Sequence, residues 1–225
     1  MIEEYQIVVK RSKRKTVSIY IERDGSVTVL APDNLEQSRL DEIIKAQEYK
    51  IYKYQAKRKL LNENAVKREP VNGQSFLYLG RNYYLQYSNE VDKIEFKGRY
   101  FYAPQVSPEK LTSLFKEFYR SRGKKFLSPR IKKYACLMGL SIDEFSVIDL
   151  KTRWASCSVK KPRLNFHWKI MMAPAGIIDY LIVHELSHIK YPRHNAEFWN
   201  SVDKIMPDYP KHVAWLEKYG ASLEI

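Results

Sequence analysis

The sequence predicts an α+β fold, with a β-rich N-terminal part that contains one long helix and a compact, helix-dominated core after it. Segments that alternate apolar and polar residues around glycine-containing turns are concentrated before Pro104. After Pro104, apolar residues recur mainly at the three- and four-residue spacing of helices. We therefore expect a basic N-terminal part over residues 1–104 and a core over residues 105–225, or one continuous domain.

The N-terminal part is expected to contain three β-hairpins and one helix. A hairpin is predicted where apolar and polar residues alternate on either side of Asp24-Gly25. Apolar residues between Leu40 and Leu61 keep helical spacing, which predicts one amphipathic helix over residues 36–62. Two further hairpins are predicted to turn near Gly80-Arg81 and near Gly98-Arg99.

Two consecutive helices are expected at the start of the core. Ser107 is a suitable N-cap for the first of them. The pair Ser128-Pro129 is typical of a helix start, since proline is favoured in the first helical turn. A second helix is therefore predicted from there through Met138, ended by Gly139.

The remaining chain is expected to form two strands and three helices. The strands are predicted in FSVIDLKTRWASCS and PRLNFHWKI, with a turn around residues 160–162. A helix is expected to open at Ala173-Pro174 and to run through His188, because Pro192 prevents it from continuing much further. Two short helices are predicted near residues 197–206 and 210–219.

The net charge of +13 is distributed unevenly along the chain. Residues 1–135 contain 28 Lys and Arg against 16 Asp and Glu, an excess of 12. Residues 136–225 contain 11 against 10 and are almost neutral. The basic part fits nucleic acid or another acidic partner, and it equally fits a solvated face without a partner.

The sequence is expected to belong to a cytoplasmic protein that does not enter a membrane. The N-terminal residues contain no apolar run long enough for a signal peptide, and no segment approaches the length of a membrane span. The two cysteines, Cys136 and Cys157, cannot form a disulfide framework, which fits a reducing compartment.

Residues 184–188, HELSH, have the spacing of a zinc-binding helix. Residues four apart on an α-helix lie on one face, so His184 and His188 can bind one Zn²⁺. A catalytic zinc ion usually takes three protein ligands, and His194 is the candidate for the third, because Pro192 forces the chain out of the helix between them. We expect one zinc ion per chain; a structural trio of polar residues is the alternative.

Glu185 adjoins the first of these histidines and is the candidate general base. A zinc ion held by three neutral imidazoles would activate a water and polarise a carbonyl, and Glu185 would take the proton of that water. This chemistry suits peptide-bond hydrolysis and also fits other amides. A metal-binding scaffold without turnover is a further alternative, although the presence of Glu185 argues against it.

The histidines lie in a set of motifs that resembles the YgjP-like metallopeptidase domain family, which is related to the SprT-like and WLM zinc peptidases. The motifs are RWASCS (153–158), LNFHW (164–168), the AP and IIDYLIVHELSH segments of 173–188, and H, E, F and W within 194–199. The resemblance implies a zincin-type core, zinc ligation by His184, His188 and His194, Glu185 as general base, and a protein or peptide substrate. Some SprT-like and WLM relatives cleave proteins crosslinked to DNA, which adds a DNA-bound protease as an alternative.

The sequence departs from the family pattern at two positions. Ala155 stands where glycine is usual, so a positive φ at that residue is in doubt. Phe166 stands where tryptophan is common, which keeps an aromatic side chain. The five-residue gap before His194 also matches the metzincin spacing, but Tyr191 occupies the position of the metzincin glycine.

Several other residues have two interpretations each. Asn165 lies in a strand, residues 163–168, that is expected to align an extended substrate by backbone pairing. Cys157 is either a further metal ligand or a small buried residue, and Tyr191 either contacts the transition state or packs against the turn. Further residues are expected to support the site or its fold, namely Arg153, Trp154, Asp179, Phe198 and Trp199.

Overall fold

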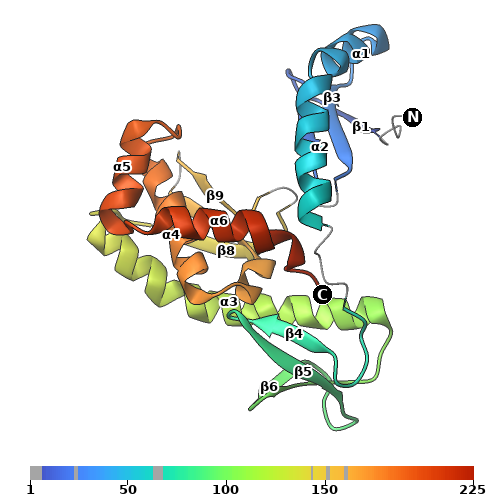
Figure 1. Ribbon diagram of the computed structural model, residues 1–225, viewed down its shortest axis with the longest axis vertical. Coiled ribbons are helices and arrows are strands. Elements are labelled where there is room, and N and C mark those ends of the chain that lie inside the picture. Colours follow the sequence, from blue (N-terminus) through green and yellow to red (C-terminus); the bar gives the residue numbers. More distant parts are fainter. Residues whose placement is uncertain (1–6, 23–24, 63–67, 143, 151–152, 160–161) are drawn as a thin grey trace. The chain divides into compact units, whose positions relative to one another are not determined.

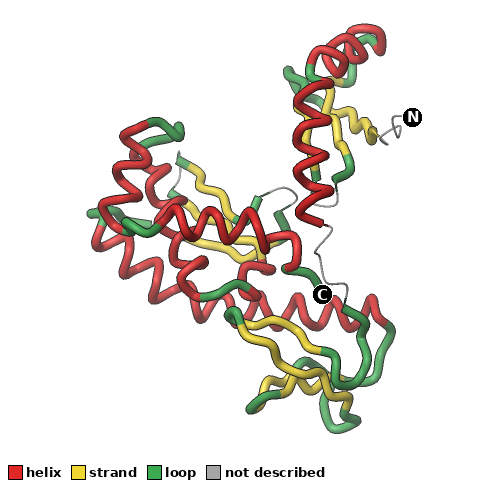
Figure 2. Tube along the Cα trace, viewed as in Figure 1, coloured by secondary structure: helices red, strands yellow, loops and turns green. Residues whose placement is uncertain are grey.

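The computed structural model describes residues 7–22, 25–62, 68–142, 144–150, 153–159 and 162–225. It has an α+β fold with three small sheets, as expected (Figures 1 and 2). The chain forms two compact units, Met1–Ala65 and Val66–Ile225. This division falls before the second and third hairpins, whereas the boundary expected from the sequence falls after them. The hairpins belong with the second unit because their apolar faces are part of its core.

The first unit contains a three-stranded sheet of strands β1 (Ile7–Ser12), β2 (Ser18–Ile21) and β3 (Val27–Pro32). The central strand, β3, pairs antiparallel with β2 and parallel with β1. The predicted first hairpin is therefore confirmed in its strands, while Asp24 of its turn lies outside the described residues. Alternate residues of β3, Val27, Val29 and Ala31, are buried.

Two helices cover residues 37–62 where one was predicted, so the prediction of a continuous helix was wrong. Helix α1 spans Gln37–Ala46 and helix α2 spans Glu48–Asn62. Gln47 between them has φ −105° and ψ 3°. Leu40 and Ile51 are both buried in one small cluster with β3. A straight helix would hold them about 16 Å apart, so the break lets both side chains reach the same short sheet.

The second unit begins with the two other predicted hairpins, both of which are confirmed. Their strands are β4 (Ser75–Tyr78), β5 (Arg81–Tyr87), β6 (Glu95–Lys97) and β7 (Tyr100–Ala103). A parallel β5–β7 pair joins them into one sheet. Gly80, at the first turn, has φ +78°, and a Cβ there would lie 2.8 Å from Pro174. This close approach lets the turn hold the segment before helix α4 (Ala175–Lys190), since Gly80 N–H donates to the carbonyl of Met172 at 3.0 Å.

A single helix, α3 (Pro108–Leu137), replaces the two that were predicted, and that prediction was wrong. Its N-cap is Ser107, as expected, and Gly139 follows its end with φ +61°. Pro129 lies inside the helix. Leu127 and Ile131, on either side of it, are buried in the same core, so packing offsets the hydrogen bond that proline removes.

The second sheet of this unit contains β8 (Glu144–Ile148), β9 (Ala155–Ser158) and β10 (Arg163–His167) in the order β8-β10-β9. The antiparallel pairing of β9 with β10 is as expected, although residues 160–161 of their turn lie outside the described residues. The second predicted strand was expected to reach Ile170 but ends at His167. A 3₁₀ helix, η1 (Trp168–Met172), follows because the His167 side chain accepts a hydrogen bond from the N–H of Lys169.

The last three helices agree with the prediction within two residues at each end. They are α4 (Ala175–Lys190), α5 (Ala196–Ile205) and α6 (Tyr209–Tyr219), and a 3₁₀ turn, η2 (Gly220–Ser222), follows them. Helix α4 contacts α3, α5, α6 and β9, so it lies at the centre of the unit. Among the described helices, none is long and apolar enough to cross a bilayer.

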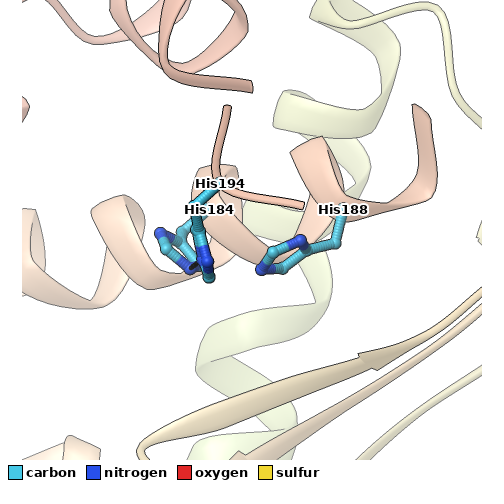
Figure 3. Close-up of side chains that lie close together, drawn as sticks. All are labelled: His184, His188 and His194. Carbon is cyan, nitrogen blue, oxygen red and sulfur yellow. Dashed lines mark hydrogen bonds between the residues drawn. The ribbon is translucent and has the colours of Figure 1, made fainter. Parts of the chain in front are cut away.

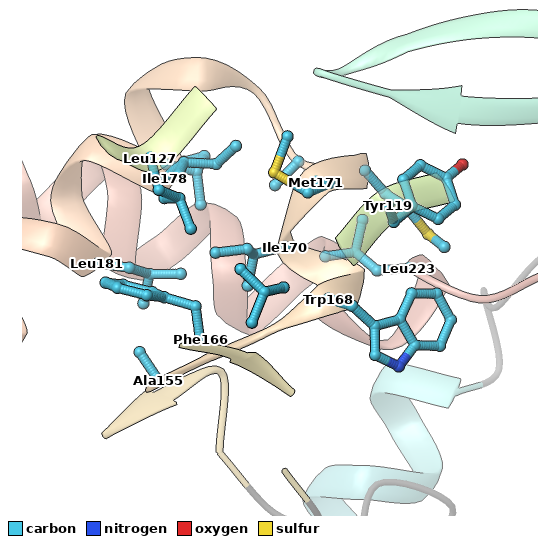
Figure 4. Close-up of a cluster of buried hydrophobic side chains, with 14 of the residues drawn as sticks. Tyr119, Leu127, Ala155, Phe166, Trp168, Ile170, Met171, Ile178, Leu181 and Leu223 are labelled. Atoms are coloured by element: carbon cyan, nitrogen blue, oxygen red, sulfur yellow. The ribbon is translucent and has the colours of Figure 1, made fainter. Parts of the chain in front are cut away.

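The core beneath α4 draws side chains from most elements of this unit (Figure 4). They include Tyr119, Leu127, Ala155, Phe166, Trp168, Ile170, Met171, Ile178, Leu181 and Leu223. Phe166 is fully buried, so an aromatic residue fills the position where tryptophan is common. Because α4 packs on this core along its length, its polar residues are held in fixed positions.

Candidate functional site

The helix α4 combines an apolar surface with a short polar motif. Ile178, Ile182, Val183 and Leu186 are almost fully buried and hold the helix in the core. Glu185 lies among them and is only 6% exposed. A polar group at such a position needs a partner or a function, because burying it unpaired is costly.

The structure brings His184, His188 and His194 together (Figure 3). Their candidate ligand atoms all lie within 4.8 Å of one another, and the Nε2 atoms of His184 and His194 are 3.0 Å apart. Two nitrogens bound to one tetrahedral zinc ion lie about 3.3 Å apart, given Zn–N distances of ~2.0–2.1 Å. The three imidazoles therefore fit a single ion after small side-chain adjustments.

His194 reaches the other two through the turn between α4 and α5. The helix ends at Lys190, as expected from Pro192, and the side chain of Asn195 accepts a hydrogen bond from Phe198 N–H at 3.1 Å to start α5. The buried ring of Phe198 lies 4.6–4.9 Å from the rings of the three histidines. Phe198 thus braces the turn, as the sequence suggested.

Two oxygen atoms orient the histidines on α4. Nδ1 of His188 lies 3.2 Å from the carbonyl oxygen of Tyr191, and Nδ1 of His184 lies 3.2 Å from the hydroxyl oxygen of Tyr180. If both Nδ1 atoms carry the hydrogen, each Nε2 keeps its lone pair for a metal. The sequence reading missed Tyr180, for which the four-residue spacing to His184 was the available signal.

The two histidines on α4, His184 and His188, are held in the neutral form that binds metals. Burial, together with the neighbouring His188 and His194, lowers the pKa of His184 to about 3. Burial is also the largest cause of the lowered pKa of His188, against the hydrogen bond to the Tyr191 carbonyl. Both rings are therefore unprotonated at neutral pH, as metal ligation requires.

Glu185 has the electrostatic environment of a proton-transfer group. Burial raises its pKa to about 7, while the positive charge of Arg153 acts in the opposite direction. A carboxyl group with such a pKa can both accept and release a proton near neutral pH. Its neighbours on the helix are the first histidine and the buried Leu186.

The three histidines and Glu185 open into a cleft of about 540 Å³. Its remaining lining comes from β9 with the residues around it, from α4, from the turn after α4 and from α6. These residues are Arg153, Trp154, Ala155, Ser156, Cys157, Val159, Tyr180, Leu181, Pro192 and Leu216. A cleft of this volume lies within the range of ligand-binding pockets.

The strand beside the cleft is β9, and the expectation that residues 163–168 align a substrate was wrong. Strand β10 is the middle strand and is hydrogen-bonded on both edges, whereas β9 has a second edge with no partner strand among the described residues. The carbonyl of Trp154 accepts a hydrogen bond from His167 N–H at 2.8 Å. In an antiparallel pair, residues that hydrogen-bond to the partner strand alternate with residues that do not. Because Trp154 bonds to β10, the N–H and C=O groups of Ala155 and Cys157 point away from β10.

Two positions that were ambiguous in the sequence are now placed. Among the described residues other than glycine, positive φ occurs at Leu79 and not at Ala155, so no strain arises at that departure from the family pattern. Cys157 lines the cleft, and burial, aided by the negative charge of Glu185, raises the pKa of its thiol to about 11. Cys157 is thus a protonated thiol at neutral pH, and it is absent from the three-histidine group of possible ligands found in the described residues.

The structure also places Asp179, Tyr191 and Trp154. Asp179 faces α3, where its Oδ1 lies 3.0 Å from Nε of Arg130, so it supports the packing of α4. Tyr191 contributes its carbonyl to the site, while the residue lines a separate pocket with Leu137 and Met138. Trp154 packs edge-on against His167, with ring centroids 6.1 Å apart.

The chain is similar to known proteins in its sequence family and has a weaker structural similarity. A family model described as "YgjP-like, metallopeptidase domain" matches residues 15–219. No curated protein matches the sequence significantly. A solved structure described as "Crystal structure of the metallopeptidase zymogen of Pyrococcus abyssi abylysin" aligns with a TM-score of 0.38 and 19% identity, over 41% of this chain and 94% of that chain.

Proposed function

Because the chain belongs to the YgjP-like metallopeptidase family, we propose that it is a zinc-dependent peptidase whose ion is held by His184, His188 and His194, with Glu185 as general base. One observation carries this proposal. Three imidazoles converge within 4.8 Å beside a buried carboxyl group, at the wall of a cleft. A structural role alone does not account for three histidines whose ligand atoms face one another.

The donor set favours zinc among common metals. Imidazole nitrogens suit zinc, whereas magnesium and calcium prefer oxygen ligands. Three protein ligands leave a fourth position open, which is typical of catalytic rather than structural zinc sites. When bound, the ion would supply a Lewis acid that polarises the scissile carbonyl and makes a water more acidic.

Glu185 would hold and move the proton. Its carboxyl group lines the cleft next to the histidines, and it is the single Asp or Glu among the described residues that line the cleft. It would accept a proton from the attacking water and deliver it to the amine that leaves. Burial of Glu185 keeps bulk water from competing for this transfer.

The edge of β9 would position the substrate. An extended peptide that pairs with β9 would use the outward backbone groups of Ala155 and Cys157. Such pairing aligns the peptide by its main chain, so it works for many sequences. It would also hold the peptide in the cleft that contains Glu185.

The first experiment is measurement of the zinc content of the purified protein beside that of His194→Ala. We expect about one zinc ion per chain in the wild type and a clear loss in the variant. His212→Ala is the matched control, because His212 lies on α6 outside the three-histidine group. A wild-type protein that stays empty after incubation with zinc would overturn the proposal.

A further inference from the structure

The cleft contains one fixed positive charge besides the proposed ion. Among the described residues that line it, Arg153 is the single Lys or Arg. Apart from the histidines and Glu185, the other side chains that line the cleft carry no charge. A negatively charged group in the cleft therefore has one protein cation to meet, whereas a positively charged group meets only Glu185.

Arg153 lies where a paired substrate would pass. It precedes β9 by two residues, and its side chain is exposed. If the extended backbone continues to Arg153, its side chain lies on the same face as those of Ala155 and Cys157. That face is directed toward α4, because β9 contacts α4 and both Ala155 and Cys157 pack in the core that includes α4.

Arg153 also shares the cleft with the proposed reaction centre. It lines the same cleft as Glu185 and His188. The positive charge of its guanidinium group therefore belongs to the cleft that would hold the substrate groups beside the scissile bond.

We propose that Arg153 binds a carboxylate group of the peptide substrate, so that the cleft selects acidic peptides. This inference rests on the proposed peptidase function. Guanidinium and carboxylate groups form paired hydrogen bonds with charge assistance, and the partly enclosed cleft strengthens them. The carboxylate belongs either to an Asp or Glu side chain near the scissile bond or to the C-terminus of the peptide.

Binding to the Glu185→Gln variant tests the inference without turnover. Fluorescent peptides that are blocked at both ends would carry Glu, Gln or Lys at successive positions, and a second set would have a free C-terminus. We expect the best acidic peptide to bind about tenfold more tightly than its Gln counterpart, which corresponds to one charge-assisted contact. A preference within the end-blocked peptides would assign the carboxylate to an Asp or Glu side chain. Tighter binding of the peptides with a free C-terminus would assign it to the C-terminal carboxylate.

The variants assign the preference to one residue. Arg153→Gln in the same background should abolish it, and Arg153→Lys should keep part of it. Arg163→Gln is the control, because Arg163 is exposed on β10 and pairs with Glu144 outside the cleft. The same binding measurement after removal of the metal by a chelator distinguishes carboxylate binding by Arg153 from carboxylate binding by the ion.

Equal binding of acidic and neutral peptides, or a preference that survives in Arg153→Gln, would overturn the inference. Zinc content of each variant shows that its site is intact. A wild-type protein that holds zinc and binds acidic peptides through Arg153 but cleaves none of them would contradict the peptidase function alone. The two proposals can therefore fail separately.

Discussion

The hydroxyl oxygen of Tyr180 lies 3.2 Å from Nδ1 of His184, one helical turn further along α4. This contact orients the ring, and Nε2 of His184 lies 3.0 Å from Nε2 of His194. With the hydrogen on Nδ1, Nε2 keeps its lone pair for a metal ion. Phenylalanine at 180 would keep the packing of the ring and remove this partner. We expect Tyr180→Phe to weaken zinc binding about 10- to 100-fold in competition with a chelator. Unchanged zinc affinity would show that packing alone orients His184.

Glu185→Gln should separate metal binding from catalysis. The amide has almost the same size as the carboxyl group but cannot accept the proton, so zinc should stay bound. Cleavage of a denatured protein substrate should fall about 10²- to 10⁴-fold, the usual contribution of a general base. A variant that keeps wild-type cleavage would exclude Glu185 from proton transfer, and a chelator should abolish cleavage by the wild type.

Phe198 connects the stability of the fold to the geometry of the histidines. Its ring is fully buried between α5 and the three imidazoles. Phe198→Ala should lower the free energy of unfolding by about 3–5 kcal/mol. It should also weaken zinc binding, because the turn that carries His194 loses its support. Phe198→Leu is the control that keeps most of the volume, and equal zinc affinity in all three proteins would contradict the bracing role.

Asp149 gives the fold an acid-dependent contact. Partial burial acts to raise its pKa, but hydrogen bonds from Lys116 and Trp168 outweigh that effect, so the pKa lies below its ordinary value. The contact therefore stabilises the protein above the unfolded-state pKa and is lost as pH falls through the lower folded-state pKa. Asp149→Asn should lower the melting temperature at pH 7, and the difference should shrink as the pH falls below the ordinary pKa of aspartate. A difference that stays constant with pH would contradict the role of its charge.

The metal-binding motif and the hairpins were predictable because short-range spacing carries them. His184 and His188 are related by one helical turn, and a proline set the end of that helix. The hairpin turns at Gly80 and Gly98 were also predictable from the local sequence, because both glycines have a positive φ, which favours glycine. Zinc ligation itself and nucleic-acid binding by the basic residues of 1–135 stay predictions; for the second, steep loss of DNA binding with added salt would be the test.

Features that depend on tertiary packing were not predictable from local patterns. The helix continues through Pro129 because both its halves share one core, and it breaks at Gln47 because Leu40 and Ile51 meet one small sheet. The order of β8, β10 and β9 decides which strand has a free edge, and local sequence does not specify that order. Strand β10, to which substrate alignment was assigned, is paired on both edges, and local sequence could not reveal this.

The free edge of β9 can be tested with a proline that removes one outward N–H. Cys157→Pro leaves the β9–β10 hydrogen bonds in place, because the alternating pattern points the Cys157 N–H away from β10. We expect this variant to keep its zinc but to lose most peptide cleavage through a raised KM. Cys157→Ala keeps the N–H and should cleave normally, whereas Ser156→Pro removes a hydrogen bond to β10 and should lower stability. If Cys157→Pro cleaves as well as Cys157→Ala, the substrate does not pair with the backbone of β9 at this residue.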